Sequence, residues 1–582
     1  MGNHNLGFDV PEQRLQSRGS FDLRPKSIEN WLTNLPRANI GMMAKQVYDL
    51  LTESNRVIMA PAERQQLLQQ LCEPIDYLLE AMEKHYIGLS LPLPSKNKKI
   101  SLLAQNLLHE FVIAHKCAIL DTLNEHKVRY HRRQLAMLMH NHLAFNNRLL
   151  KCLNLTYNTV PSSFWREQCL IFQYAEQLSI SEVAVFGNSS PWSVLNRFKQ
   201  AILLTLSAPY SLAQQEIQQL NSQLTDWVSS CRLLNMSQYT PGQHTQFINL
   251  NSDKGPQHCE QLTEFDDGWR IIDTSEITPI LENEISQIQH KLTSMHLQKE
   301  TLQRVHKQMS TGQRRQFNRT SKPDTFTLAI GTSAIHWMLS HHTHSAEKKI
   351  EQPASYQSSL VRSVEFTDAP DVWNVYRDAS TTRPLGQSDL NQPIEYKTYD
   401  FNVINESANG FQLHLKEYQQ TIGLKVGELI SLHKGFNGSG QQFGLAHIRW
   451  IHQISAEELI IGVELLAPDA IPVEVSLQQK ENQKIESAPL MMRALLLPAL
   501  PAMKQAATLI APDTFKAGQE ILLHQNDITN TIRLTHISNQ CCSHAQFQFD
   551  VLKSQPKPTD NAQAETPDKD DDDDLENVWE LL

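Results

Sequence analysis

The spacing of hydrophobic residues changes near residue 394, and that change constrains the fold more than any other feature of the chain. From residue 27 to about 308, apolar residues recur every three or four positions, as in Leu67, Leu71 and Ile75, which is the period of amphipathic helices. From Ile394 onward the period moves towards two, which is the period of half-buried strands. The sequence therefore predicts an α+β multidomain protein, with a helical half followed by β-rich modules.

Chain breakers and shifts in composition set the expected domain boundaries. The antiparallel strands expected after residue 394 are short and separated by turn residues, which is typical of a small β-barrel. We predict a flexible leader (1–20), an α-helical domain (21–308), a β-barrel with an insertion at about 333–393 (309–480), a small β-rich C-terminal module (490–553) and a disordered acidic tail (554–582).

Charge and composition exclude several classes of protein. The net charge is −11, and residues 568–576 hold seven of the acidic side chains, so no general DNA- or RNA-binding surface is indicated. No apolar run approaches the roughly 18 residues that span a bilayer, and the polar start of the chain does not resemble a signal peptide. The eight cysteines are scattered without regular spacing, which is typical of reduced thiols in a cytoplasmic protein.

The segment that carries the binding chemistry is residues 401–413, FNVINESANGFQL. Within it, Asn405, Ser407 and Gly410 follow one predicted strand and precede another. Asparagine and serine side chains shape turns by bonding to nearby backbone groups, and Gly410 permits a close backbone approach. A polar turn of this kind, at the rim of a barrel, can present an amide and a hydroxyl to the edge of a heterocycle.

Three landmarks follow in order: residues 425–430 (KVGELI), 444–450 (GLAHIRW) and 461–466 (IGVELL). Together with the Asn-x-Ser-x-x-Gly turn, this order resembles a PilZ domain. The resemblance implies a six-stranded antiparallel barrel that binds cyclic di-GMP. It also implies an upstream Arg-x-x-x-Arg motif, whose guanidinium groups bind phosphate oxygens and lie against guanine.

The arginine motif departs from the usual position. No Arg-x-x-x-Arg stands shortly before Asn405, where Arg377 and Arg383 have a longer spacing. Further upstream, Arg315 and Arg319 match the motif and precede a strand-like run at residues 325–330. We therefore predict that Arg315 and Arg319 are the phosphate-binding pair. The alternative is that they belong to a solvated helix end.

The resemblance predicts a bacterial cyclic di-GMP receptor that passes nucleotide binding to a helical, partner-binding domain. The predicted nucleotide-binding residues are Arg315, Arg319, Asn405, Ser407 and Gly410. We find no acid–base pair, nucleophile or metal-ligand spacing, so no catalytic residue and no metal ligand is predicted and the chain is not expected to be an enzyme. Two alternatives stay open: a degenerate PilZ adaptor that binds no nucleotide, and an enzyme with its active site in the helical half.

Overall fold

The computed structural model is divided into two compact units, and the first contains most of the helices and a β-barrel. The structure describes residues 7–15, 21–124, 131–186, 191–241, 245–259, 264–287, 299–311, 319–321, 324–343, 396–416, 418, 422–434, 442–455, 457–477, 491–499, 505–525, 528–541 and 543–556. Arg315, the predicted insertion beyond residue 343 and the acidic tail therefore lie outside the described residues.

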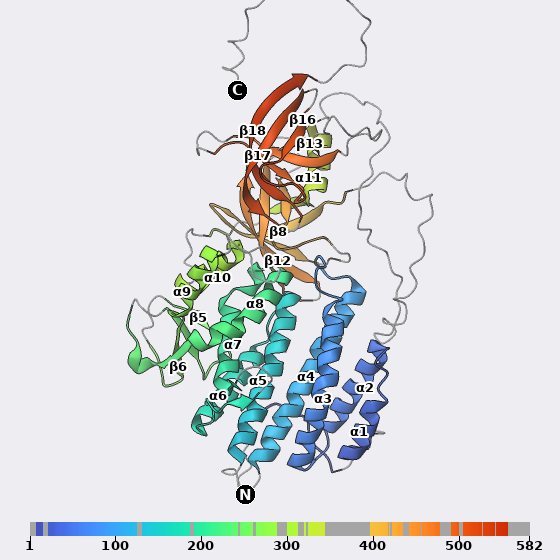
Figure 1. Cartoon of the computed structure of the whole chain (residues 1–582), viewed down its shortest axis with the longest axis vertical. Coiled ribbons are helices and arrows are strands. Elements are labelled where there is room, and N and C mark those ends of the chain that lie inside the picture. The colour runs from blue at the N-terminus through green and yellow to red at the C-terminus, as the bar shows by residue number, and fades with distance from the viewer. Residues whose placement is uncertain are drawn as a thin grey trace, which may run out of the picture. The chain divides into compact units, whose positions relative to one another are not determined.

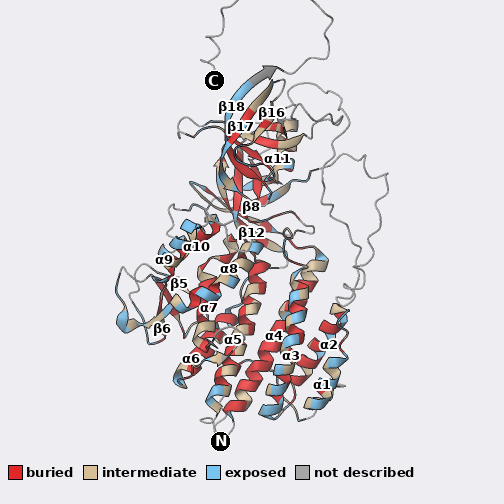
Figure 2. Ribbon diagram, viewed as in Figure 1, coloured by how far each residue is buried: buried red, intermediate tan, exposed pale blue. Residues whose placement is uncertain are grey.

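The N-terminal half is an array of antiparallel helices (Figure 1). Leu67, Leu71 and Ile75 are all buried on one face of their helix, as the period of three to four predicts. The two longest central helices are buried along most of their length (Figure 2). The helices of the first unit are α1 (Pro25–Thr33), α2 (Ile40–Ser54), α3 (Pro61–Glu83), α4 (Ser95–Leu123), α5 (Arg132–Leu155), α6 (Ser162–Gln177), α7 (Val194–Leu206), α8 (Gln214–Trp227), α9 (Ile277–Gln287) and α10 (Lys299–Thr311). A further helix, α11 (Thr332–Thr343), belongs to the second unit from His336 onward.

A small antiparallel sheet interrupts the helices, with the strand order β3-β6-β4-β5. The strands are β3 (Arg232–Asn235), β4 (Gln246–Asn249), β5 (Gln257–His258) and β6 (Trp269–Asp273), and a separate pair is formed by β1 (Val185–Phe186) and β2 (Pro191–Trp192). The side chain of Gln246 donates to the carbonyl oxygen of Met309 at 2.9 Å, and Thr274 donates to the same oxygen at 2.8 Å. These bonds hold the end of α10 against the sheet.

The first barrel is closed, with the order β10-β11-β12-β9-β8-β7. Its strands are β7 (Thr325–Ile330), β8 (Tyr399–Ser407), β9 (Gly410–Lys416), β10 (Leu429–Lys434), β11 (Gln442–Gln453) and β12 (Glu458–Ala467). Each includes a segment for which the sequence predicts a strand. Since β7 pairs directly with β8, 68 residues separate two neighbouring strands, from 331 to 398.

The barrel and the helices of the first unit share one hydrophobic core. The backbones of Leu91 and Leu424 exchange two hydrogen bonds of 2.8 and 2.9 Å. The end of β11 contacts the segment that follows α5, where the backbone N–H of Gln453 donates to the carbonyl oxygen of Tyr157 at 2.8 Å. The first barrel is therefore attached directly to the helical array.

The second unit is built on a second closed barrel, with the order β13-β14-β15-β18-β17-β16 and its own hydrophobic core. Its strands are β13 (Ile471–Leu477), β14 (Met492–Leu497), β15 (Thr508–Ala511), β16 (Glu520–Gln525), β17 (Ile528–Gln540) and β18 (Ala545–Pro556). The predicted α+β fold class is confirmed.

One predicted boundary differs from the observed topology. The sequence-based limit at residue 480 placed residues 471–477 in the first barrel, but β13 pairs with β14 and β16 of the second barrel. Alternating hydrophobicity shows that a segment is a strand, but it does not show which strands will be its neighbours.

Candidate functional site

The predicted Asn-x-Ser-x-x-Gly turn is the hairpin between β8 and β9. Ser407 and Gly410 are paired across it, and the hydroxyl of Ser407 donates to the carbonyl oxygen of Gly410 at 3.1 Å. The pairing register shifts between Val403 and Asn405. Such β-bulges turn a side chain away from the regular alternation and are frequent beside binding sites.

Arg319 reaches this hairpin through a short stretch of backbone pairing. The neighbouring Thr320 forms an isolated antiparallel bridge with Glu406, with backbone N–O distances of 2.9 and 3.0 Å. Arg319 Nη1 then donates to Gln412 Oε1 at 3.4 Å, and Asn405 Nδ2 donates to the same oxygen at 2.6 Å. Arg319 and Asn405, which are 86 positions apart, thus share one acceptor on β9.

The charge of Arg319 is not neutralised within the part of the chain that the structure describes. Its side chain is exposed, and its one hydrogen bond there goes to a neutral amide oxygen at 3.4 Å. A guanidinium group has five N–H donors and binds carboxylate or phosphate groups through two of them at once. The free donors of Arg319 are therefore available to an anion beside the hairpin.

Gly410 has a structural reason to be glycine. A Cβ atom at this position would overlap the carbonyl oxygen of Val463 on β12. The close approach expected from the sequence is therefore made by a neighbouring strand. The hairpin is also held from this side by a hydrogen bond of 2.9 Å from the backbone N–H of Leu465 to the carbonyl oxygen of Asn409.

The second and third downstream landmarks, residues 444–450 and 461–466, lie on the paired strands β11 and β12. Trp450 is the register partner of Gly462, and its indole ring fills the space that a side chain at Gly462 would need. Beside this pair, Arg449 and Glu464 form an ion pair across the two strands. The tryptophan and the glycine are therefore coupled, because the ring needs a residue without a side chain opposite it.

Five residues were predicted to bind nucleotide, and the structure describes four of them. Asn405, Ser407 and Gly410 lie in one hairpin, and Arg319 joins Asn405 through Gln412. Arg315 lies outside the described residues, as do the alternative arginines Arg377 and Arg383. In the described ranges, no group of three His, Cys, Asp or Glu side chains is arranged to hold a metal ion, and no helix is long and apolar enough to cross a membrane.

Sequence reasoning missed Gln412. The signal was present in residues 401–413, because Gln412 lies between the apolar residues Phe411 and Leu413 and therefore points to the opposite face of β9 from the buried Leu413. What the sequence lacked was the pairing that sets Gln412 opposite Asn405. The bulge at residue 404 makes this register difficult to predict.

A closed six-stranded barrel with an Asn-x-Ser-x-x-Gly hairpin and an arginine paired beside it defines the class of PilZ-like domains. Comparison with known families gives the same class. Three family models match in succession: "Cyclic-di-GMP receptor FimW, N-terminal domain" over residues 26–238, "Cyclic-di-GMP receptor FimW, middle PilZ domain" over 246–472, and "FimW C-terminal beta-barrel domain" over 476–552. The chain therefore belongs to the PilZ-domain family.

Within that family, the chain is similar to the cyclic-di-GMP receptor FimW of Pseudomonas aeruginosa. The two are 25% identical over 594 residues, which cover 96% of this chain and 95% of the relative. No solved structure matches the chain. The middle family model begins at residue 246, and so includes β4 to α10, which the predicted boundary at 308 assigned to the helical domain.

Proposed function

We propose that this chain is a receptor for cyclic di-GMP and that it binds the nucleotide at the hairpin between β8 and β9. The observation that carries the proposal is the pairing of Thr320 with Glu406, which lays Arg319 beside Asn405. The similarity to a curated cyclic-di-GMP receptor over almost the whole chain supports the same ligand.

The chemistry of the site fits a cyclic dinucleotide, which carries two phosphates and two guanine rings. Arg319 offers uncompensated donors to phosphate oxygens, and we assign Arg315, four positions earlier, the second guanidinium. Asn405 and Ser407 offer an amide and a hydroxyl to the edge of a guanine, while Gly410 keeps the hairpin close to β12. Binding needs no bond to be broken, so this role requires no catalytic group.

We assign the output to the helical domain, through the end of β11. There the ring of His452 packs on Tyr210 with centroids 4.6 Å apart and an interplanar angle of 34°, and His452 Nε2 lies 3.0 Å from the hydroxyl of Thr159. A change in the barrel would move this contact and alter how the helices meet a protein partner. The described cysteines are free thiols, which supports a reducing compartment such as the cytoplasm.

Isothermal titration of the full chain with cyclic di-GMP tests the proposal. We expect saturable binding, and we expect Arg319→Ala to weaken it by about 1.5–3 kcal/mol, the range for a hydrogen bond to a charged group. Arg37→Ala is the matched control. Arg37 is an exposed arginine in the segment between α1 and α2, and it pairs with Glu73 at 2.8 Å. Both residues are far from the barrel strands in the sequence. No heat from a folded chain would contradict the proposal and favour an adaptor that binds no nucleotide.

The same titration with Arg315→Ala addresses the arginine that the structure does not describe. We expect a loss of the same size as for Arg319→Ala. If only Arg377→Ala or Arg383→Ala weakened binding, the phosphate-binding pair would have to be reassigned to those two residues.

A further inference from the structure

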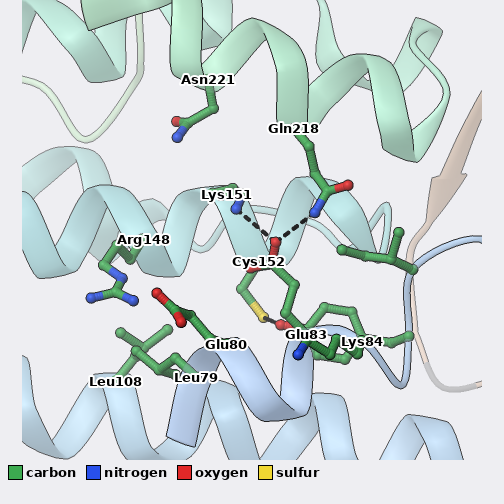
Figure 3. A pocket seen from close by; sticks show the side chains of 12 residues that line it. Leu79, Glu80, Glu83, Lys84, Leu108, Arg148, Lys151, Cys152, Gln218 and Asn221 are labelled. Atoms are coloured by element: carbon green, nitrogen blue, oxygen red, sulfur yellow. Dashed lines mark hydrogen bonds and ion pairs between the residues drawn. The ribbon is translucent and has the colours of Figure 1, made fainter. Parts of the chain in front are cut away.

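A polar groove lies in the helical domain between α3, α5, α7 and α8. It has two chambers of about 640 and 620 Å³, which share Arg148 and Asn221 in their walls. We name them the first and second chamber. Figure 3 shows the first, with Arg148 and Lys151 on α5, Glu80 and Glu83 on α3, and Asn221 on α8 around the space. Together the chambers are large enough for a peptide rather than for a single ion.

Arg197 lines the second chamber and is held there firmly. Its guanidinium lies over the ring of Trp192, 4.0 Å from the centroid. Its Nε donates to His140 Nε2 at 3.0 Å, and its Nη1 donates to Gln200 Oε1 at 3.0 Å. Since an arginine has five N–H donors, three of them stay without a protein acceptor in the described ranges.

Within the described part of the chain, both hydrogen-bond acceptors of the Arg197 guanidinium are neutral. His140 accepts from Arg197 with Nε2, and its Nδ1 lies 3.1 Å from the side-chain oxygen of Asn141, so the ring is an uncharged Nδ1–H tautomer. Burial and the neighbouring Arg197 lower the pKa of His140 to about 4, which keeps it uncharged at neutral pH. Burial and the charge of Arg148 lower the pKa of Arg197 to about 10. Arg197 is thus a partly buried cation with no carboxylate partner among the described residues, and an anion in the chamber would stabilise it.

The formal charges of the other residues in the groove walls cancel, because Lys84 and Glu80 of the first chamber carry opposite charges and the two remaining cations form ion pairs. Arg148 forms an ion pair with Asp76, which also lines the second chamber, and Lys151 pairs with Glu83 at 2.8 Å. Helices α5 and α7 contain no Asp or Glu at all, so the wall that they form is cationic. Glu80 and Glu83 balance Lys84 and Lys151 in the first chamber, and Asp76 balances Arg148, which leaves Arg197 in the second chamber as the site for a negative group.

The first chamber differs from the second in its apolar surface. Leu79, Ile87 and Leu108 contribute to its wall, and Leu79 and Leu108 are drawn below Arg148 in Figure 3. A ligand that fits both chambers would therefore carry carboxylates at one end and apolar side chains at the other.

We propose that this groove binds an acidic peptide segment with an apolar end, and that the occupant is residues 568–582 of this chain. That segment reads DKDDDDDLENVWELL, with seven acidic residues up to Glu576 and then Val578, Trp579, Leu581 and Leu582. The aspartates pair with Arg197 in the second chamber, and the apolar residues enter the first. Occupation of the groove by the chain's own acidic segment would compete with a partner for the helical domain.

Fluorescence anisotropy with a labelled peptide of residues 568–582 tests this inference. The receptor is the full chain in which Asp570 to Asp574 are each replaced by asparagine, so that its own segment does not compete. We expect saturable binding that weakens as salt is added. In the same background, Arg197→Gln should weaken binding by at least about tenfold. The control is Arg132→Gln, an exposed arginine at the start of α5 whose Nη2 donates to the carbonyl oxygen of Ser179.

A second variant keeps the test independent of the fold around Arg197. Ala144 lines the second chamber and is half-buried, so Ala144→Glu adds a carboxylate there without removing a native hydrogen bond, and it should abolish peptide binding. A peptide carrying Trp579→Ser should also bind more weakly. The inference is overturned if the peptide does not bind, if the Arg197→Gln and Ala144→Glu variants bind it as tightly as their parent, or if 10 mM inorganic phosphate binds Arg197 while the peptide does not.

Discussion

Replacing Gln412 with alanine would remove the acceptor that Arg319 and Asn405 share, without changing either of these two proposed nucleotide-binding residues. Gln412 Oε1 accepts from Asn405 at 2.6 Å and from Arg319 at 3.4 Å. A neutral hydrogen bond contributes about 1 kcal/mol net, and the longer bond to Arg319 contributes less. In the variant, the ligand must also order both freed side chains, at roughly 0.5–1.5 kcal/mol each. We expect cyclic di-GMP binding to weaken by about 1–2 kcal/mol, or roughly 5- to 30-fold.

The assay is isothermal titration of the Gln412→Ala chain, with its unfolding midpoint measured alongside. Gln412 is half-buried on the outer face of β9, so the midpoint should hardly change. Asn402→Ala is the control, because Asn402 is an exposed amide on the neighbouring strand that accepts a bond of 3.3 Å from Thr325. Unchanged affinity in Gln412→Ala would mean that the arrangement of Arg319 and Asn405 around this acceptor has no part in binding, and the reasoning would be wrong.

Three other predictions concern stability and coupling. Gly410→Ala should lower the free energy of unfolding by about 1–3 kcal/mol in denaturant titrations, because its methyl group would overlap the carbonyl oxygen of Val463. Burial lowers the pKa of His115 to about 4, so between about pH 6.5 and pH 4 the unfolded chain binds a proton that the folded chain does not. His115 alone should therefore decrease the free energy of unfolding by about 1.4 kcal/mol for each unit by which the pH is lowered through that window, and His115→Gln should reduce the slope by that amount. Tyr210→Ala removes the ring that packs on His452, and it should diminish nucleotide-dependent changes in amide exchange of α8 while leaving nucleotide affinity within about twofold.

Much of the fold could be predicted because each element carries its own local signal. The run at residues 325–330 reads as a strand, and it forms β7 with the same bounds. The period of three to four in α3 places Leu71 and Ile75 in the core. Strand neighbours carry no such signal: β13 follows β12 after three residues and yet pairs in the other barrel. Pairing between distant strands is set by packing and loop closure, which a single sequence does not display.

The residues of the candidate site also fall into those that a local sequence signal could predict and those whose position depends on distant pairing. Asn405, Ser407 and Gly410 could be predicted as one unit, because they form a turn within six residues. The position of Arg319 depends on the pairing of Thr320 with Glu406, across a segment of chain longer than most loops in compact domains. Arg197 gave no sequence signal, since its role follows from neutral neighbours on α5 and α7 that only the folded helices bring together.

A structure of the full chain with bound cyclic di-GMP would test the central claim most directly. The decisive quantity is the distance between the guanidinium nitrogens of Arg319 and the nearest phosphate oxygens. We predict about 2.7–2.9 Å, with a guanine edge within hydrogen-bond distance of Asn405 or Ser407. A nucleotide bound at any other surface, with the β8–β9 hairpin and Arg319 left without contact, would contradict the proposal.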